Sequence, residues 1–233
     1  MREAFSLLEF IIALFILSIA LILAGSFKPQ QPLTFATQSL ISDLALTQSL
    51  ALNDSRFFPN LASTALTKSL SPSINPHKLI THPEKNMWQI QFHTSGIYTQ
   101  NSYSIYLDTP RHSHTTDYDG RPMSGDFIAT ESLNNQCLSG YNNSNVSDYC
   151  KNNTSPFVRL QEYFGVENMN LEGDSFCTEK GGWRIYFDDF GTPYCGKIPK
   201  KLTKLLKITL HKGKQSQSIC LTPNTGYAFL CEN

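Results

Sequence analysis

An apolar run near the beginning of the chain restricts its fold more than any other feature. Residues 5–27 read FSLLEFIIALFILSIALILAGSF, and Glu9 is the one charged side chain among them. As a helix rising about 1.5 Å per residue, this run can cross a hydrocarbon layer of roughly 30 Å. A cleavable secretory signal has a shorter apolar core, usually about 7 to 15 residues, and ends in a small-x-small site. Because Ile22 lies two residues before Ala24, a retained membrane segment is favoured over removal of the whole run.

The cysteines indicate on which side of a membrane the rest of the chain lies. All six are in the C-terminal half and none forms a C-x-x-C pair. An even number favours disulfides in an oxidising compartment over zinc binding or redox catalysis. Residues beyond about 28 are therefore expected outside the cytoplasm, in the periplasm or its equivalent. Six cysteines allow 15 connectivities, and the sequence does not choose among them; pairing of neighbours along the chain is the working hypothesis. The cysteines are Cys137, Cys150, Cys177, Cys195, Cys220 and Cys231.

A second helix is expected directly after the apolar run. Pro29 and Pro32 remove amide donors, so a helix leaving the membrane should kink or end there. Between Leu33 and Asp54 there is no Gly or Pro, and apolar residues recur at helical spacing: Ala36, Leu40, Ile41, Leu44, Ala45 and Leu52. We expect a leader over residues 1–4, a membrane helix over 5–27, a kinked amphipathic helix over 28–54 and a head domain over 55–233. A core helix without any role in assembly has the same pattern.

The head is expected to be rich in antiparallel strands. Residues 55–84 contain prolines, serines and threonines without sustained periodicity, which indicates a loop. Runs rich in β-branched and aromatic residues follow, separated by polar turns. The predicted strands are 87–92, 103–107, 127–129, 183–187, 205–210, 218–221 and 227–230. The fold class is α+β, with a long N-terminal hydrophobic helix leading into an antiparallel β-rich head held by disulfides.

Two disulfides have a predicted structural role. The segment 134–155 has almost no large apolar residues, so we expect a long surface loop constrained by Cys137 and Cys150. At the C-terminus, placing Cys220 opposite Cys231 in a hairpin leaves Thr225 and Gly226 as a two-residue turn. Gly226 can adopt the positive φ that such a turn requires.

Glu9 is the physical anomaly of the apolar run. A carboxylate within the hydrocarbon costs a few kcal/mol on insertion scales, so it is expected to have a partner or a function. If the chain is cut before Phe5, the new α-amino group lies four residues from this acid. The amine of a neighbouring copy can then neutralise Glu9, which favours assembly within the membrane and sets the stagger between subunits.

The residues AFSLLEFIIALFILSIALILAGSF, at 4–27, resemble the class III signal and N-terminal helix of the type IV pilin and pseudopilin superfamily. The resemblance implies cleavage by a prepilin peptidase between Ala4 and Phe5, methylation of the new N-terminus, and direction of assembly by Glu9. Ala4 stands where the family usually has Gly. The implied partners are the peptidase, other pilins or pseudopilins and an inner-membrane assembly platform, with secreted cargo or DNA as further candidates. The implied location is a single-pass inner-membrane protein with a periplasmic C-terminal domain.

The remainder of the chain resembles GspH/FimT-type minor pseudopilins of type II secretion and their pilus relatives. The resemblance rests on the helix at 36–52, on WRIYFDDFGTP and on KITLHKGKQSQSICLTPNTGYAF, and residues 55–180 show no correspondence. It implies a structural minor subunit of a secretion or pilus filament. Two other functions stay open: a DNA-uptake (competence) pilin, and an exported, membrane-anchored domain that does not polymerise.

The DNA-uptake alternative depends on a stretch of basic residues without an acid. The formal net charge of the whole chain is zero, with 19 basic and 19 acidic residues, yet residues 197–214 hold seven lysines, which leaves 12 bases against 19 acids elsewhere. Exposed positive charge of this kind contacts phosphates. In LLKITLHK, however, polar and apolar residues alternate, so a half-buried strand with a polar outer face explains the pattern too. The lysines are Lys197, Lys200, Lys201, Lys204, Lys207, Lys212 and Lys214.

Catalysis and metal binding have little sequence support. His112, His114, Asp117 and Asp119 match the spacing of neither a zinc site nor an EF-hand loop, and a polar turn is expected there. Gly173, Asp174 and Ser175 are like the nucleophile block of GDS-type esterases, but no apolar strand is apparent before them and no Asp-x-x-His pair follows. The chain also lacks G-x-S-x-G, H-E-x-x-H and P-loop motifs. We expect no enzyme activity and no cofactor.

Overall fold

The computed structural model describes residues 11–18, 32–54, 87–94, 100–109, 120–141 and 145–232. The chain divides into two compact units, Met1–Gln31 and Pro32–Asn233, and the second is called the head below. In the first unit, residues 11–18 are helical and their side chains are exposed. The rest of the helix expected over 5–27 lies outside the described residues. None of the helices in the described ranges combines the length and apolar character needed to cross a membrane.

The head begins with helix α2, Pro32–Leu52. Pro32 occupies the first position of the helix, where its missing amide is not needed. The buried side chains follow helical spacing: Leu33, Ala36, Thr37, Leu40, Leu44, Thr47 and Ala51. The hydroxyls of Thr37 and Thr47 donate to the carbonyls four residues earlier, at 2.7 Å each, which satisfies them inside the core. The helix therefore covers the later part of the range predicted over 28–54, with Ala45 and Leu52 exposed, and residues 28–31 with the predicted kink lie outside the described residues.

A six-stranded antiparallel sheet has the order β3-β2-β1-β5-β6-β7. Its strands are β1 (Trp88–His93), β2 (Ser102–Leu107), β3 (Phe127–Ile128), β5 (Gly182–Phe187), β6 (Pro193–Cys195) and β7 (Lys200–Lys201). In the central register Ile90 lies between Ile105 and Ile185, and Phe92 lies between Tyr103 and Trp183. The Phe92 ring stacks on Trp183 with centroids 5.3 Å apart, so aromatic cross-strand contacts fix the middle of this sheet.

A four-stranded antiparallel sheet has the order β10-β9-β8-β4. Its strands are β4 (Asn168–Glu172), β8 (Leu206–Lys212), β9 (Gln215–Leu221) and β10 (Ala228–Leu230). Strands β8 and β9 form a hairpin in which Lys212 pairs with Gln215. Gly213, in the two-residue turn between them, has φ +56°, a value that a glycine adopts without a side-chain clash.

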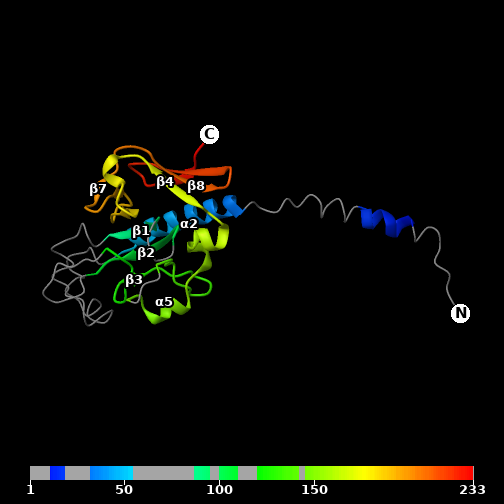
Figure 1. The fold of residues 1–233 in the computed structure, drawn as a ribbon, viewed down its shortest axis with the longest axis horizontal. Helices are drawn as coiled ribbons and strands as arrows, with labels where there is room; N and C mark the ends of the chain where they lie inside the picture. Colours follow the sequence, from blue (N-terminus) through cyan, green and yellow to red (C-terminus); the bar gives the residue numbers. More distant parts are fainter. Residues whose placement is uncertain are drawn as a thin grey trace. The chain divides into compact units, whose positions relative to one another are not determined.

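Helix α2 contacts strands of both sheets, and Figure 1 shows it between β1–β2 on one side and β8 on the other. One apolar core joins the three layers, since Leu40 and Leu44 of the helix belong to the same buried cluster as Ile90 and Ile208. Four short helical turns complete the described head: α5 (Asp148–Asn152), η3 (Pro156–Val158), η4 (Leu160–Phe164) and η5 (Ser175–Cys177). The α+β class with antiparallel sheets is therefore confirmed. Strands β4, β6 and β7 were not among the predicted strands.

Candidate functional site

The residues predicted to direct processing and assembly are Ala4, Phe5 and Glu9. All three lie outside the described residues. The loop predicted over 55–84 lies outside them as well, as do His112, His114, Asp117 and Asp119. These assignments stay predictions, and the site described below belongs to the head.

The three disulfides join neighbouring cysteines, as predicted. Their Cα–Cα distances are 5.3 Å for Cys137–Cys150, 5.0 Å for Cys177–Cys195 and 5.2 Å for Cys220–Cys231. These separations are normal for a disulfide, and no cysteine is free. The six cysteines are therefore structural, each pair closing a loop between adjacent elements.

The C-terminal hairpin differs from the prediction in its register. Cys220 lies opposite Phe229, not opposite Cys231, whose amide donates to the Ser218 carbonyl at 2.9 Å. The disulfide therefore runs diagonally, and the connection is a four-residue loop, 223–226. The Gly226 amide closes this loop by donating to the Thr222 carbonyl at 3.1 Å. Gly226 does have the predicted positive φ, at +63°.

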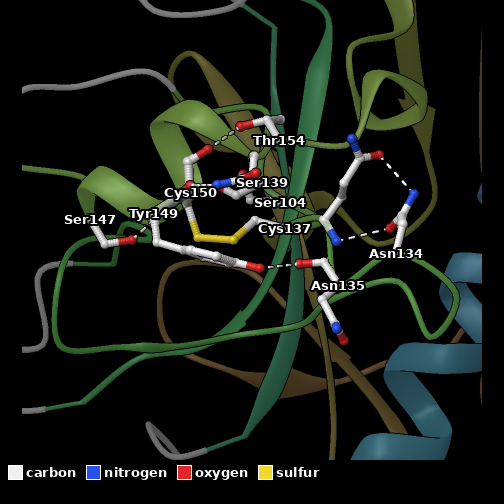
Figure 2. Close-up of a disulfide and its surroundings, with 11 residues drawn as sticks. Ser104, Asn134, Asn135, Cys137, Ser139, Ser147, Tyr149, Cys150 and Thr154 are labelled. Carbon is white, nitrogen blue, oxygen red and sulfur yellow. Dashed lines mark hydrogen bonds between the residues drawn. A yellow bond between two sulfur atoms is a disulfide. The ribbon is translucent and has the colours of Figure 1, made fainter.

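The segment around Cys137–Cys150 is not only a surface loop, which corrects the sequence-based expectation. The backbone at Ser139 pairs with Ser104 of β2 and continues the six-stranded sheet along that edge. Figure 2 shows the disulfide between this added edge and α5, with the Tyr149 hydroxyl donating to the Asn135 carbonyl at 3.0 Å. Four buried side chains of this segment join Met123 in what we call the outer cluster: Met123, Cys137, Tyr141, Val146 and Cys150.

The outer cluster lies on the side of the six-stranded sheet that faces away from α2. On that face the strands carry polar side chains, which are nevertheless buried. His93 Nε2 lies 3.1 Å from the Ser104 hydroxyl, which lies 3.2 Å from the Ser139 hydroxyl. The Tyr141 ring packs on His93 with centroids 5.1 Å apart. Burial, helped by the charge of Arg184, lowers the pKa of His93 to about 3, so this histidine is neutral and structural.

An ion pair completes this polar face. Arg184 donates to both carboxylate oxygens of Glu179, at 3.0 and 2.9 Å, and both side chains are mostly buried. A side chain at Gly120 would collide with the Arg184 guanidinium, with 2.5 Å between the added Cβ and Nη1. Burial raises the pKa of Tyr186 to about 12 despite the nearby arginine. Both tyrosines on this face, Tyr106 and Tyr186, therefore stay protonated as hydrogen-bonding groups at neutral pH.

The lysine stretch divides into two parts. Lys207 of β8 lies opposite Glu172, and Lys212 donates to the Phe164 carbonyl at 2.7 Å, so these two belong to the structure of the four-stranded sheet. In β8, Leu206, Ile208 and Leu210 are buried in the core, as the alternation predicted. The other five lysines are exposed: Lys197, Lys200, Lys201, Lys204 and Lys214.

Asp174 orders the loop that carries one of the exposed lysines, Lys204. Its carboxylate accepts from the Thr203 amide and hydroxyl at 2.7 Å each and from the Lys204 amide at 3.3 Å. Burial alone would raise the pKa of Asp174, but these hydrogen bonds and the Lys204 charge lower it. The residue noted in the sequence for its likeness to an esterase block is thus a structural carboxylate that orders the loop after β7.

A groove of about 420 Å³ opens beside α2, on the β3 side of the head. One wall is α2, with Phe35, Ser39, Ser42, Asp43 and Leu46, and the other includes residues 130–133, Leu138 and Phe157. The Tyr103 hydroxyl donates to Asp43 Oδ2 at 2.5 Å, and the Ser155 hydroxyl bonds to Glu131. The groove therefore combines aromatic and aliphatic walls with two carboxylates.

The charge of one carboxylate, Glu131, changes the pKa of the other, Asp43. Burial raises the pKa of Asp43 to about 6; the Tyr103 hydrogen bond opposes this shift and the charge of Glu131 adds to it. A positive charge placed in the groove would relieve that repulsion. The sequence analysis missed Asp43 and Glu131. A signal was present for the first, because an acid at position 43 sits directly beside the apolar stripe that includes Leu40 and Leu44.

Metal ligation finds no support in the part of the chain that the structure describes, where no three His, Cys, Asp or Glu side chains gather. Comparisons with known proteins add no relative. No protein-family model, no curated protein and no solved structure matches this chain.

Proposed function

We propose that this chain is a structural subunit, a minor pseudopilin or minor pilin, of a type II secretion or type IV pilus-like filament. The observation that carries the proposal is the apolar run 5–27, with one acid at Glu9, behind a four-residue leader. The disulfides add support, because they suit a head that folds outside the cytoplasm. The helical residues 11–18 also present exposed apolar side chains, which a lipid or helix-bundle environment would cover.

Assembly is the proposed activity. A prepilin peptidase cuts between Ala4 and Phe5, and the apolar helix is held in the inner membrane with the head in the periplasm. The carboxylate of Glu9 then pairs with the α-amine of Phe5 in a neighbouring subunit. In hydrocarbon both charges lack water, so forming the pair removes a large part of the cost of each and favours the correctly staggered neighbour.

The geometry of the head favours a structural role over catalysis. Its His–Ser pair, His93 and Ser104, is buried and the histidine is neutral, so neither group is presented to a substrate. Three disulfides and one core shared by α2 and both sheets make a rigid body. A head of this kind presents a fixed surface to neighbouring subunits.

A DNA-uptake pilin is the second candidate function, and five exposed lysines in an acid-free stretch support it. Two observations weigh against it: Lys207 lies opposite Glu172, and Lys212 is bound to the Phe164 carbonyl. A titration of the protein with duplex DNA at several salt concentrations separates the candidates. Salt-sensitive binding that falls on replacing Lys200 and Lys201 supports DNA uptake, and no binding at low salt removes it.

The proposed function is tested at the N-terminus of the native protein. Mass spectrometry should find a chain that starts at a methylated Phe5. Glu9→Ala should abolish incorporation into filaments while membrane insertion is unchanged, and Glu3→Ala, within the leader that cleavage removes, is the matched control. A native chain that still starts at Met1 would support the membrane-anchored domain that does not polymerise.

A further inference from the structure

The groove beside α2 has exposed apolar side chains at its rim. Leu133 is 97% exposed and Phe35 is 40% exposed, and both line the groove. The Phe35 ring packs on Phe157 and Phe164 with centroids 5.7 Å apart in each case, so the apolar wall is held in place. A rigid apolar wall open to water is a feature of interaction surfaces.

The negative charge in the groove favours a positively charged partner. Asp43 and Glu131 are the two acids among the described residues that line it, and none of these described residues is basic. An occupant with an aliphatic body and an ammonium group would cover the apolar wall and neutralise the carboxylates. Lysine beside a large apolar residue has that chemistry.

Such a segment lies at the other side of this chain's own head. Residues 197–201 read Lys-Ile-Pro-Lys-Lys, and Ile198 is 72% exposed between exposed lysines. The Lys200 ammonium lies 5.7 Å from the centroid of the Phe176 ring, and Lys200 belongs to β7, an edge strand of the six-stranded sheet. This segment thus offers an apolar side chain flanked by positive charge, the complement of the groove.

The two surfaces cannot meet within one head. Residues 130–133 of the groove follow β3, and residues 200–201 form β7; β3 and β7 are the opposite edges of the six-stranded sheet. Five spacings of about 4.8 Å separate these edges, roughly 24 Å in all. A contact between them joins two copies, and it is heterologous, so it repeats from one copy to the next unless the rotation closes a ring.

We propose that the groove receives residues 197–201 of a second copy of this chain, with Ile198 against the Phe35–Phe157 wall and the lysines beside Asp43 and Glu131. The proposal deepens the filament function and rests on it for its biological setting. It names a head-to-head partner in addition to the Glu9–amine contact. Because the chain carries both surfaces, no second protein is required.

Photo-crosslinking of the full chain in detergent tests the contact. A benzophenone amino acid replaces Leu133, whose side chain is almost wholly in solvent, and tagged and untagged copies are mixed before irradiation. Mass spectrometry should identify residues 197–205 of the other copy in the crosslinked product. A product that maps to residues 1–31 or 55–86, or the absence of a crosslinked dimer, overturns the proposal.

Charge variants make the test specific. Lys200→Glu with Lys201→Glu should lower the yield of crosslinked dimer about tenfold, the effect of losing one good charge contact. Ser42→Lys, which adds a cation to the α2 wall, should lower it too, and combining all three changes should restore it. Lys214→Glu, an exposed lysine outside the segment, is the matched control and should leave the yield within about twofold. Equal losses in all variants, or no rescue, would contradict the contact.

The outcome is separable from that of the proposed function. Crosslinked heads from a chain that is never cleaved before Phe5 would preserve the contact and remove the filament. Correct processing and Glu9-dependent assembly without the Leu133 product would preserve the filament and remove the contact. Rising salt should weaken the crosslink in either case, because exposed charges are screened.

Discussion

The two sheets of the head differ in how far the polar side chains on their outer faces are buried. On the six-stranded sheet the polar side chains Gln89, His93 and Ser104 are buried; Tyr141 of the outer cluster packs on His93, and Ser104 lies beside the added edge at Ser139. On the four-stranded sheet most of the outer face stays open, with Asn170 and Glu172 exposed, although Thr209 of β8 is buried. Polar residues on the covered face must find partners inside the protein, whereas those on the open face have water.

Because of this difference, we expect side chains on the covered face to contribute more to the stability of the head than side chains on the open face. The covered face contains the ion pair Arg184–Glu179 and the neutral His93, and each depends on its neighbours. The open face tolerates change because its side chains lose little when a partner is removed. We expect matched substitutions on the two faces to have unequal effects on the free energy of unfolding. Both tryptophans, Trp88 and Trp183, lie in the head, so their fluorescence reports its unfolding.

The largest difference in the free energy of unfolding should be between substitutions of two basic strand residues, one on each face. Arg184→Gln leaves Glu179 buried without its partner and should lower the free energy of unfolding by about 3–5 kcal/mol. Lys207→Gln, on the open face opposite Glu172, should change it by about 0.5 kcal/mol or less. Guanidinium unfolding followed by tryptophan fluorescence measures both. Replacing Arg184 by Met together with Glu179 by Leu should recover most of the loss, and equal effects of the two single variants would refute the comparison.

The next prediction compares two disulfides whose loss should cost similar stability but should loosen different parts of the head. Replacing Cys137 and Cys150 by Ala, or Cys220 and Cys231 by Ala, opens loops with sequence separations of 13 and 11 residues. Chain entropy predicts a loss of about 3 kcal/mol for either pair. Only the first pair belongs to the outer cluster, so only its loss should speed amide hydrogen exchange in β2, at Ser104 and Tyr106. Faster exchange in β2 after loss of the second pair would argue against separate faces.

The sequence predicts the open face better than the covered one, for a physical reason. In β8 the alternation with polar residues predicts the burial of Leu206, Ile208 and Leu210 correctly, and the polar Lys207 and His211 stay half-buried, because water reaches that side of the strand; Thr209 is the exception, since it is buried. In β1 the alternation of Gln89 and Gln91 with apolar residues indicates a solvent-exposed face, yet Gln89 is buried. What covers a polar face is decided by residues remote in the sequence.

The groove could not be predicted for a similar reason. Asp43 comes from α2 and Glu131 from the connection after β3, and only the fold brings them to one surface. The even number of cysteines predicts disulfides, and the structure pairs neighbours along the chain, one of the 15 connectivities that the count allows. The register of the last hairpin could not be predicted, because a diagonal bridge between Cys220 and Cys231 is as compatible with the cysteine spacing as a directly opposed one.

The covered face should also make the head sensitive to acid. The pKa of His93 is near 3 in the folded chain and about 6.5 in the unfolded chain, so below pH 6.5 the unfolded chain binds a proton that the folded chain does not. Stability should fall as the pH falls from 6.5 towards 3, by about 2 kcal/mol at pH 5 from this group. His93→Gln should flatten the profile over that window, as measured by guanidinium unfolding at several pH values. His211→Gln, on the open face, is the control; a profile unchanged by His93→Gln would exclude this cause.

The smallest expected difference in the free energy of unfolding is between Ser→Ala substitutions at two serines, one on the outer face of each sheet. The Ser104 hydroxyl lies within hydrogen-bonding distance of His93 and Ser139, and all three are buried. Ser104→Ala leaves two buried polar groups short of a partner, so it should lower the free energy of unfolding by about 1–2 kcal/mol. The Ser216 side chain, opposite His211 in β9, is exposed on the open face, where water surrounds it. Ser216→Ala should therefore cost about 0.5 kcal/mol or less, and a larger loss there than at Ser104 would show that the outer cluster does not set the cost of a polar deletion.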